Sequence, residues 1–152
     1  MKIEVNGKNG YKIFINREYI KEVNFEEKDS ISEFVKKYLI KIKDKLKLRG
    51  FYKVKVFPHK KLGLYLDIKQ LEELEFSNNI DLRIIISLDE KFFFETDDYF
   101  LVSKYSNVRY LDGKFYCLID DYFDEILEIV EFGDIIYGEE VINLLNKSII
   151  LI

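Results

Sequence analysis

One long stretch of the chain repeats its hydrophobic residues with the period of an α-helix. Ser30 and Glu33 have the spacing of a capping box, and Gly50 stands where a helix C-cap belongs. Between these signals the apolar side chains fall on one arc of a helix, which is typical of a helix that packs one face on a core. The pattern therefore predicts one long amphipathic helix over about residues 31–48. The apolar arc consists of Ile31, Phe34, Val35, Tyr38, Leu39, Ile42 and Leu46.

Several shorter stretches alternate between apolar and polar residues, which is the pattern of half-buried strands. Turn-forming pairs such as Asn6-Gly7, Asp89-Glu90 and Asp112-Gly113 separate them. We therefore expect antiparallel hairpins that join residues 3–5 with 11–15, 51–57 with 64–68, 81–87 with 91–95, and 107–111 with 114–119. In the last hairpin, a two-residue turn would place Tyr110 opposite Phe115.

The remaining segments predict short elements. They are one or two helical turns at 69–75, an acidic helix over 121–131, a second short helix ending at about Lys147, and a final apolar strand over 148–152. The resulting fold class is α+β, with antiparallel β-hairpins, one long amphipathic helix and two short helices in the C-terminal half. We expect residues 1–152 to form a single compact domain or two closely packed halves, about 1–76 and 80–152, with Ser77-Asn78-Asn79 as the internal boundary.

Composition narrows the class of protein. The chain has 152 residues, of which 48% are hydrophobic and 34% charged, which is typical of a folded protein and not of a disordered tail. No apolar run approaches the roughly 20 residues of a membrane helix, and the first residues do not resemble a signal peptide. We therefore expect a cytoplasmic protein without a membrane partner. The absence of Ala and Trp beside abundant Lys, Ile and Asn favours an AT-rich bacterial or phage origin.

The net charge of −4 hides a division between the two halves of the chain. Residues 1–75 carry 18 basic and 12 acidic residues, whereas residues 76–152 carry 6 basic and 16 acidic residues. Such asymmetry can mark a nucleic-acid partner for the basic half or a cationic partner for the acidic half. The alternative is that both charge runs are merely solvated surfaces.

Nucleophilic catalysis is disfavoured by the sequence. Cys117 is the one cysteine and His59 the one histidine, so disulfides within the chain and zinc sites with several thiolate or imidazole ligands are excluded. The hairpin register places Cys117 on an apolar strand face, while His59 lies in a lysine-rich turn, where we expect it to be exposed. In the run Phe92-Phe93-Phe94, alternation would leave one ring exposed if the sheet has a solvent side.

A cluster of carboxylates begins near residue 120. Helical spacing would place several of them on one face, where they could dock a basic partner or hold a divalent cation, although no EF-hand loop is present. The alternative is a solvated helix face. The candidate protein-docking residues are Asp120, Asp121, Asp124, Glu125 and Glu128.

The segment from Lys36 to Lys61 holds eleven basic residues and one acidic residue, Asp44. Basic side chains interleaved with aromatic rings can neutralise phosphates and stack bases. A helix packed on a sheet would, however, place the helix lysines and the strand lysines on opposite sides of the layer. The candidate anion-binding residues are Lys36, Lys37, Lys43, Lys47, Lys53 and Lys55.

Three functions follow from these features. The first is a non-enzymatic cytoplasmic protein-interaction module, such as an adaptor, inhibitor or immunity-type protein, which needs no cofactor or metal and binds another protein. The alternative is a nucleic-acid-binding protein with weak sequence specificity that uses the basic 36–61 segment. The third is an enzyme that uses the carboxylates with a divalent metal. Oligomeric state is open, because the terminal strand can pair within the chain or at the edge of a dimer.

Overall fold

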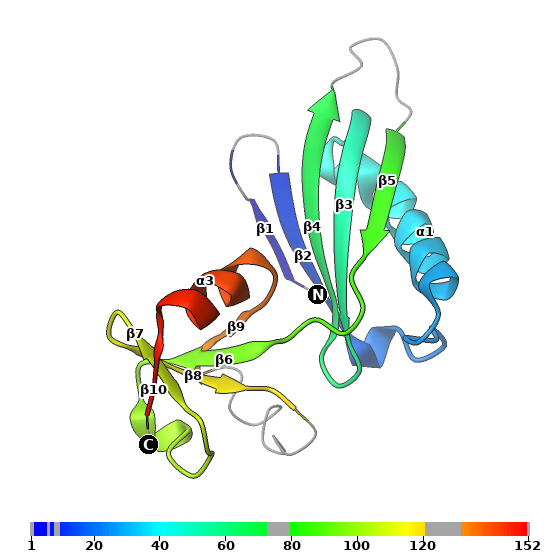
Figure 1. Cartoon of the computed structure of the whole chain (residues 1–152). Coiled ribbons are helices and arrows are strands. Elements are labelled where there is room, and N and C mark those ends of the chain that lie inside the picture. Colours follow the sequence, from blue (N-terminus) through cyan, green and yellow to red (C-terminus); the bar gives the residue numbers. More distant parts are fainter. Residues whose placement is uncertain (1, 6, 8–9, 73–79, 121–131, 152) are drawn as a thin grey trace. The chain divides into compact units, whose positions relative to one another are not determined.

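The chain divides into two compact units, residues 1–88 and 89–152, in the computed structural model (Figure 1). The structure describes residues 2–5, 7, 10–72, 80–120 and 132–151. Two sheets and two helices of the described residues confirm the α+β class. The boundary between the units falls after Leu88, and the expected boundary at 77–79 lies outside the described residues. Close packing of the two halves stays a prediction.

The first unit is built on a five-stranded sheet in the order β1-β2-β4-β3-β5. The predicted hairpins β1–β2 and β3–β4 are confirmed as antiparallel pairs. Strand β4 continues to Glu72, so the helical turns expected at 69–75 are wrong over 69–72, and the rest of that segment lies outside the described residues. The strands are β1 (Lys2–Val5), β2 (Gly10–Asn16), β3 (Gly50–His59), β4 (Gly63–Glu72) and β5 (Ile80–Ile86), with a short 3-10 helix η1 (Arg17–Tyr19).

The long predicted helix is confirmed as α1 (Lys28–Leu46), but its two end signals are corrected. Ser30 lies inside the first turn, where its Oγ accepts a hydrogen bond from the backbone N–H of Asn24 at 3.2 Å, so it does not cap the helix. At the other end Lys47, in the left-handed conformation, is the C-cap, and Gly50 already belongs to β3. The helix thus begins at Lys28, nearly one turn before the predicted start at residue 31, while its apolar arc still begins at Ile31.

The core of the first unit lies between α1 and one face of the sheet (Figure 1). Val35 and Leu39 of the helix are fully buried against Val54, Val56 and neighbouring strand residues. The side chains alternate along β3, because successive residues of a strand point to opposite faces. The helix therefore covers the face that carries the apolar residues of β2, β3, β4 and β5.

The hairpin expected between residues 81–87 and 91–95 is wrong. The chain does turn at Asp89, which adopts a left-handed conformation, but the flanking strands enter different sheets. Strand β5 pairs in parallel with β3, with Gly50 opposite Ile80. Strand β6 (Phe93–Thr96) pairs with two strands of the second unit (Figure 1).

The second unit contains a sheet in the order β10-β7-β8-β6-β9 and the helix α3 (Glu139–Lys147). The Asp112-Gly113 hairpin is confirmed, with Tyr110 opposite Phe115. The predicted second short helix is α3, and the terminal strand pairs with β7 inside the chain. The segment 121–131 lies outside the described residues. The other elements are η2 (Tyr99–Leu101), β7 (Arg109–Leu111), β8 (Lys114–Leu118), β9 (Asp134–Ile136) and β10 (Ile149–Ile150).

One face of the second sheet packs on α3. Val141 and Leu144 of the helix are buried against Phe93, Tyr116 and Ile136 of the strands. The face opposite α3 carries the alternate residues of the same strands, and it holds the candidate surface described below. In the described parts of both units, no helix is long and apolar enough to cross a membrane.

Candidate protein-interaction surface

The structure does not bring the six candidate lysines together. Lys36, Lys37, Lys43 and Lys47 lie on α1 and its C-cap, and Lys37 pairs with Glu33 at 3.0 Å between Nζ and Oε1. Lys53 and Lys55 lie on β3 and alternate with the buried residues that face α1, so they point to the other side of the layer. The basic charge is therefore spread over two opposite surfaces, as the sequence indicated, and no single patch collects it.

The acidic candidates are only partly covered by the structure. Asp120 is exposed just after β8, while Asp121, Asp124, Glu125 and Glu128 lie outside the described residues. Among the residues that the structure describes, no group of three His, Cys, Asp or Glu side chains could hold a metal ion. The metal-dependent reading of the 120–128 cluster stays a prediction.

Cys117 is buried, as the hairpin register predicted, and burial together with the charge of Asp120 raises the pKa of its thiol to about 12. A protonated thiol is a poor nucleophile. The expectation for His59 is corrected, because its side chain is half-buried and its Nδ1 accepts hydrogen bonds from the backbone N–H groups of Lys61 and Leu62, both at 3.1 Å. Neither residue has the environment of an activated nucleophile or base.

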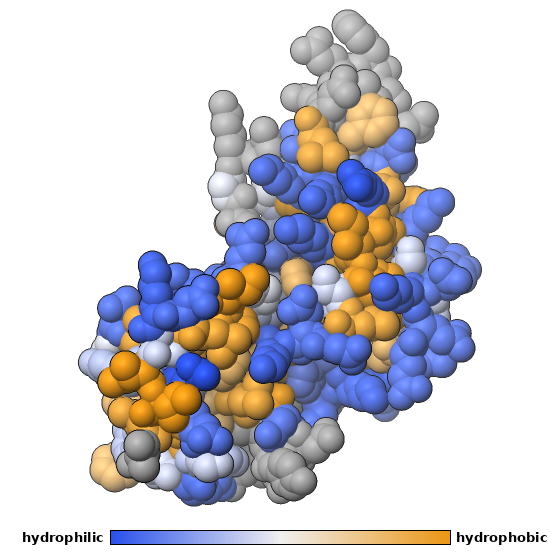
Figure 2. Space-filling view, viewed as in Figure 1, coloured by the Kyte–Doolittle hydropathy of each residue, from blue (hydrophilic) through white to orange (hydrophobic). Residues whose placement is uncertain are grey.

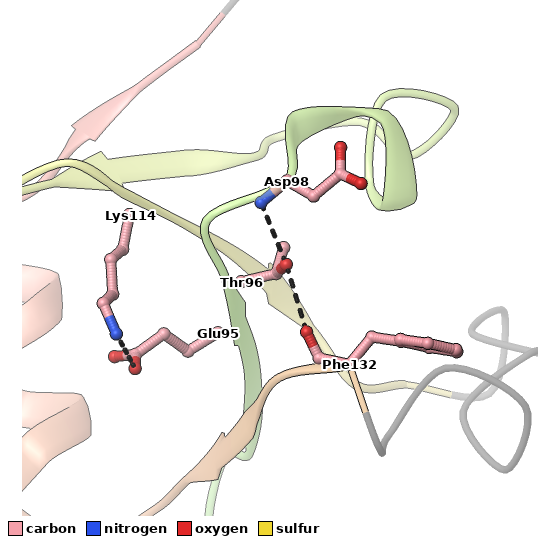
Figure 3. Close-up of polar contacts among 5 residues, drawn as sticks. All are labelled: Glu95, Thr96, Asp98, Lys114 and Phe132. Carbon is pink, nitrogen blue, oxygen red and sulfur yellow. Dashed lines mark hydrogen bonds and ion pairs between the residues drawn. The ribbon is translucent and has the colours of Figure 1, made fainter.

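A pocket of about 280 Å³ lies between α3 and the sheet of the second unit, lined in part by Glu95, Glu139 and Glu140. Lys114 donates to Glu95 with Nζ 3.2 Å from Oε1, an ion pair that raises the pKa of the lysine (Figure 3). The pKa of the Tyr116 hydroxyl is raised mainly by burial and, to a smaller extent, by a hydrogen bond to Glu95. Because the chain's own groups engage Glu95, we assign this pocket a structural role.

The opposite face of the same sheet carries an exposed row of aromatic side chains. The strand register aligns Thr96, Phe115, Tyr110 and Ile149 across four strands. The rings of Tyr110 and Phe115 are 5.3 Å apart between centroids, and Tyr99 of η2 lies 5.1 Å from Phe115 on the other side. Tyr99 is 42% exposed and Tyr110 36% exposed. We call the three rings of Tyr99, Phe115 and Tyr110 the aromatic row.

Hydrogen bonds hold one end of the aromatic row in place. Thr96 is buried, and its Oγ1 accepts from the backbone N–H of Asp98 at 3.1 Å and donates to the carbonyl oxygen of Phe132 at 3.5 Å (Figure 3). Asp98 in turn caps η2, accepting from the backbone N–H of Phe100 at 3.0 Å. Through Thr96, the turn that carries Tyr99 is therefore tied to the sheet and to Phe132.

Three exposed carboxylates neighbour the aromatic row in the sequence. Asp97 and Asp98 precede Tyr99 and are exposed, and Asp112 is exposed in the turn that follows Tyr110. The second unit as a whole contains 15 acidic and 5 basic residues, a net charge of −10. An exposed aromatic surface in this setting attracts cations and repels phosphates.

The sequence predicted one exposed ring in the run Phe92-Phe93-Phe94 if the sheet has a solvent side. Phe92, Phe93 and Phe94 are all buried, because α3 covers Phe93 and the ring of Phe94 lies against Gly133 on the other face. The hairpin signal did place Tyr110 opposite Phe115, on a face expected to be apolar. That face is buried at Cys117 but exposed at Tyr110, and no local signal joined Tyr99 to it.

Apolar surface also gathers over α3 and β10. Ile142 is 61% exposed on the helix, and Ile149 and Ile150 are exposed on the edge strand β10. Figure 2 shows hydrophobic surface over this part of the second unit.

Family models, curated proteins and solved structures were all compared with this chain, and none of them matches it.

Proposed function

We propose that this chain is a non-enzymatic protein-interaction module, of the adaptor, inhibitor or immunity type, and that its second unit binds a basic partner protein. The exposed hydrophobic side chains of that unit carry the proposal. Among the residues that the structure describes, nine of the fourteen large hydrophobic side chains that are exposed belong to residues 89–152. They are Tyr99, Phe100, Tyr110, Leu118, Phe132, Ile142, Leu145, Ile149 and Ile150.

Exposed hydrophobic surface rimmed by charge is typical of a docking surface. The net charge of −10 on the second unit selects a partner of opposite sign, because complementary potentials accelerate encounter and exclude acidic competitors. The partner is therefore expected to present a basic surface that contains apolar or aromatic contacts.

A display selection tests this proposal without knowledge of the natural partner. The full chain is immobilised, and a library of random peptides is selected on it at low salt. We expect the enriched peptides to be rich in Lys and Arg, and their affinity to fall as salt rises. Enrichment of acidic peptides, or no enrichment above that on an unrelated protein of equal charge, would contradict the proposal.

Nucleic-acid binding is the alternative, and the basic segment 36–61 favours it. Its test is fluorescence anisotropy with duplex DNA and single-stranded RNA over a salt series, since contacts to several phosphates give a steep salt dependence. Charge reversal at Lys43 and Lys47 would test the helix surface, and the matched reversal at Lys53 and Lys55 would test the sheet surface. No binding at low salt would remove this alternative.

A further inference from the structure

We infer that the aromatic row is where the partner docks, and that it receives an arginine or lysine side chain, which stacks on the rings and is attracted by the negative charge of the second unit. This inference rests on the proposed function and names the group of the partner that is recognised. Its occupant is a cationic segment of another protein, because the second unit carries a net charge of −10.

The geometry of the row suits a planar cation. The rings of Tyr110 and Phe115 are tilted by 53° and those of Tyr99 and Phe115 by 54°, so neighbouring rings do not stack flat on one another. Tyr99 and Tyr110 each present more than a third of their surface to solvent. A guanidinium or ammonium group is attracted to such ring faces, and the guanidinium adds planar stacking.

Two exposed carboxylates are close in sequence to the tyrosines of the aromatic row. Asp98 precedes Tyr99 and caps η2, and Asp112 follows Tyr110 by two residues. Pairing with a carboxylate gives the guanidinium two parallel hydrogen bonds, which adds direction to the attraction of the rings.

The unit's own cations in this sheet point away from the aromatic row. Arg109 and Lys114 alternate with Tyr110 and Phe115, so they lie on the face that packs on α3. Arg109 donates from Nη1 to Oγ of Ser148 at 3.1 Å, and Lys114 pairs with Glu95. The aromatic row thus lies on a face of the sheet from which these two cations are directed away.

Nucleobases also stack on aromatic rings, but they bring phosphates with them. With 15 acidic and 5 basic residues in the unit, phosphates would be repelled at this surface. The charge therefore favours a basic protein segment over a nucleic acid as the occupant.

The experiment titrates the full chain with an arginine-rich peptide and with the same peptide in which citrulline replaces arginine. Citrulline keeps the shape of the side chain and removes its charge. Nuclear magnetic resonance follows the ring protons of Tyr99, Tyr110 and Phe115. We expect these signals to shift with the arginine peptide and to stay unchanged with the citrulline peptide.

Variants then test the ring faces. Tyr110→Leu and Tyr99→Leu keep an apolar side chain and remove the ring, so each should weaken binding of the arginine peptide about fivefold. Tyr110→Phe keeps the ring and should bind like the wild type. Tyr19→Leu, at an exposed tyrosine of the first unit, is the matched control and should also bind like the wild type. Thermal unfolding confirms that each variant is folded, and either tyrosine variant suffices if the other does not fold.

The outcomes separate this inference from the proposed function. Basic peptides that bind Tyr99→Leu and Tyr110→Leu as tightly as the wild type would overturn the inference and leave the proposed function standing. Equal binding of the citrulline peptide would overturn the cationic recognition. Binding of single-stranded RNA that shifts the same ring protons would replace the protein partner by a nucleic acid. If no peptide of either charge binds, both proposals fail.

Discussion

The buried thiol of Cys117 makes a quantitative prediction for the pH dependence of stability. Its side chain is 3% exposed, and burial and the charge of Asp120 raise its pKa from 9.0 to about 12. The unfolded chain releases this proton near pH 9 and the folded chain near pH 12. The stabilisation is therefore fully present below pH 9 and is lost as pH rises toward 12. At pH 10 the loss amounts to about 1.4 kcal/mol.

Urea unfolding at pH 8, 9 and 10 measures this loss in the wild type and in Cys117→Ala. The variant removes one buried sulfur, which lowers its free energy of unfolding by a similar amount at each pH. Burial also raises the pKa values of Tyr65 and Tyr116, and those contributions remain in both proteins. We therefore expect the variant to lose about 1.4 kcal/mol less than the wild type between pH 8 and 10.

Thiol reactivity provides an independent check on the same pKa. At pH 8 the thiolate fraction of Cys117 should be about a thousandfold lower in the folded chain than in the unfolded chain, and reaction with a thiol reagent should slow accordingly. Parallel pH profiles for the wild type and Cys117→Ala, or a native thiol that reacts as fast as the denatured one, would refute the reasoning.

Two substitutions test the packing of the first unit by urea unfolding. Gly63→Ala should cost about 3 kcal/mol or more, because the added Cβ would clash with the carbonyl oxygen of Ile15 at a φ of 135°, whereas Gly7→Ala should cost about 1 kcal/mol, since its φ of 72° is strained but the space is open. Equal costs would contradict this account. Leu39→Ala should cost about 3 kcal/mol and the adjacent Ile40→Ala under about 1 kcal/mol, because Leu39 is fully buried and Ile40 is 44% exposed. A larger loss of stability for Ile40→Ala than for Leu39→Ala would show that the described orientation of the helix is wrong.

Local patterns predicted the elements better than their partners. The alternation along β3 and β4 and the Asp112-Gly113 turn predicted hairpins that the structure confirms, because a short turn fixes which strands meet. The turn at Asp89 was also predicted, yet its strands separate. An alternating strand carries no signal for its neighbour when that neighbour is distant in sequence, so the parallel pairing of β5 with β3 could not be predicted.

The candidate surface shows the same limit. The register of one hairpin predicted that Tyr110 faces Phe115, and it did not reveal that this end of the sheet is exposed. Tyr99 of η2 contacts Phe115 of β8, and the hydrogen bond between Thr96 and Asp98 holds η2 in place. No pattern along the chain indicates this contact. The dispersal of the lysines, in contrast, followed from the helix and strand periods alone.

The parallel pairing of β5 also sets an order of events during synthesis. Strands β3 and β4 can pair as soon as both leave the ribosome, because His59 lies opposite Gly63. Strand β5 is made later, and its partner Gly50 precedes Ile80 by about thirty residues. Until then the apolar strand β3, with Val54 and Val56, keeps one edge unpaired, and such an edge can join that of another nascent chain. The half-exposed lysines Lys53 and Lys55 on that strand place charge at this edge during the interval, where like charges oppose such pairing.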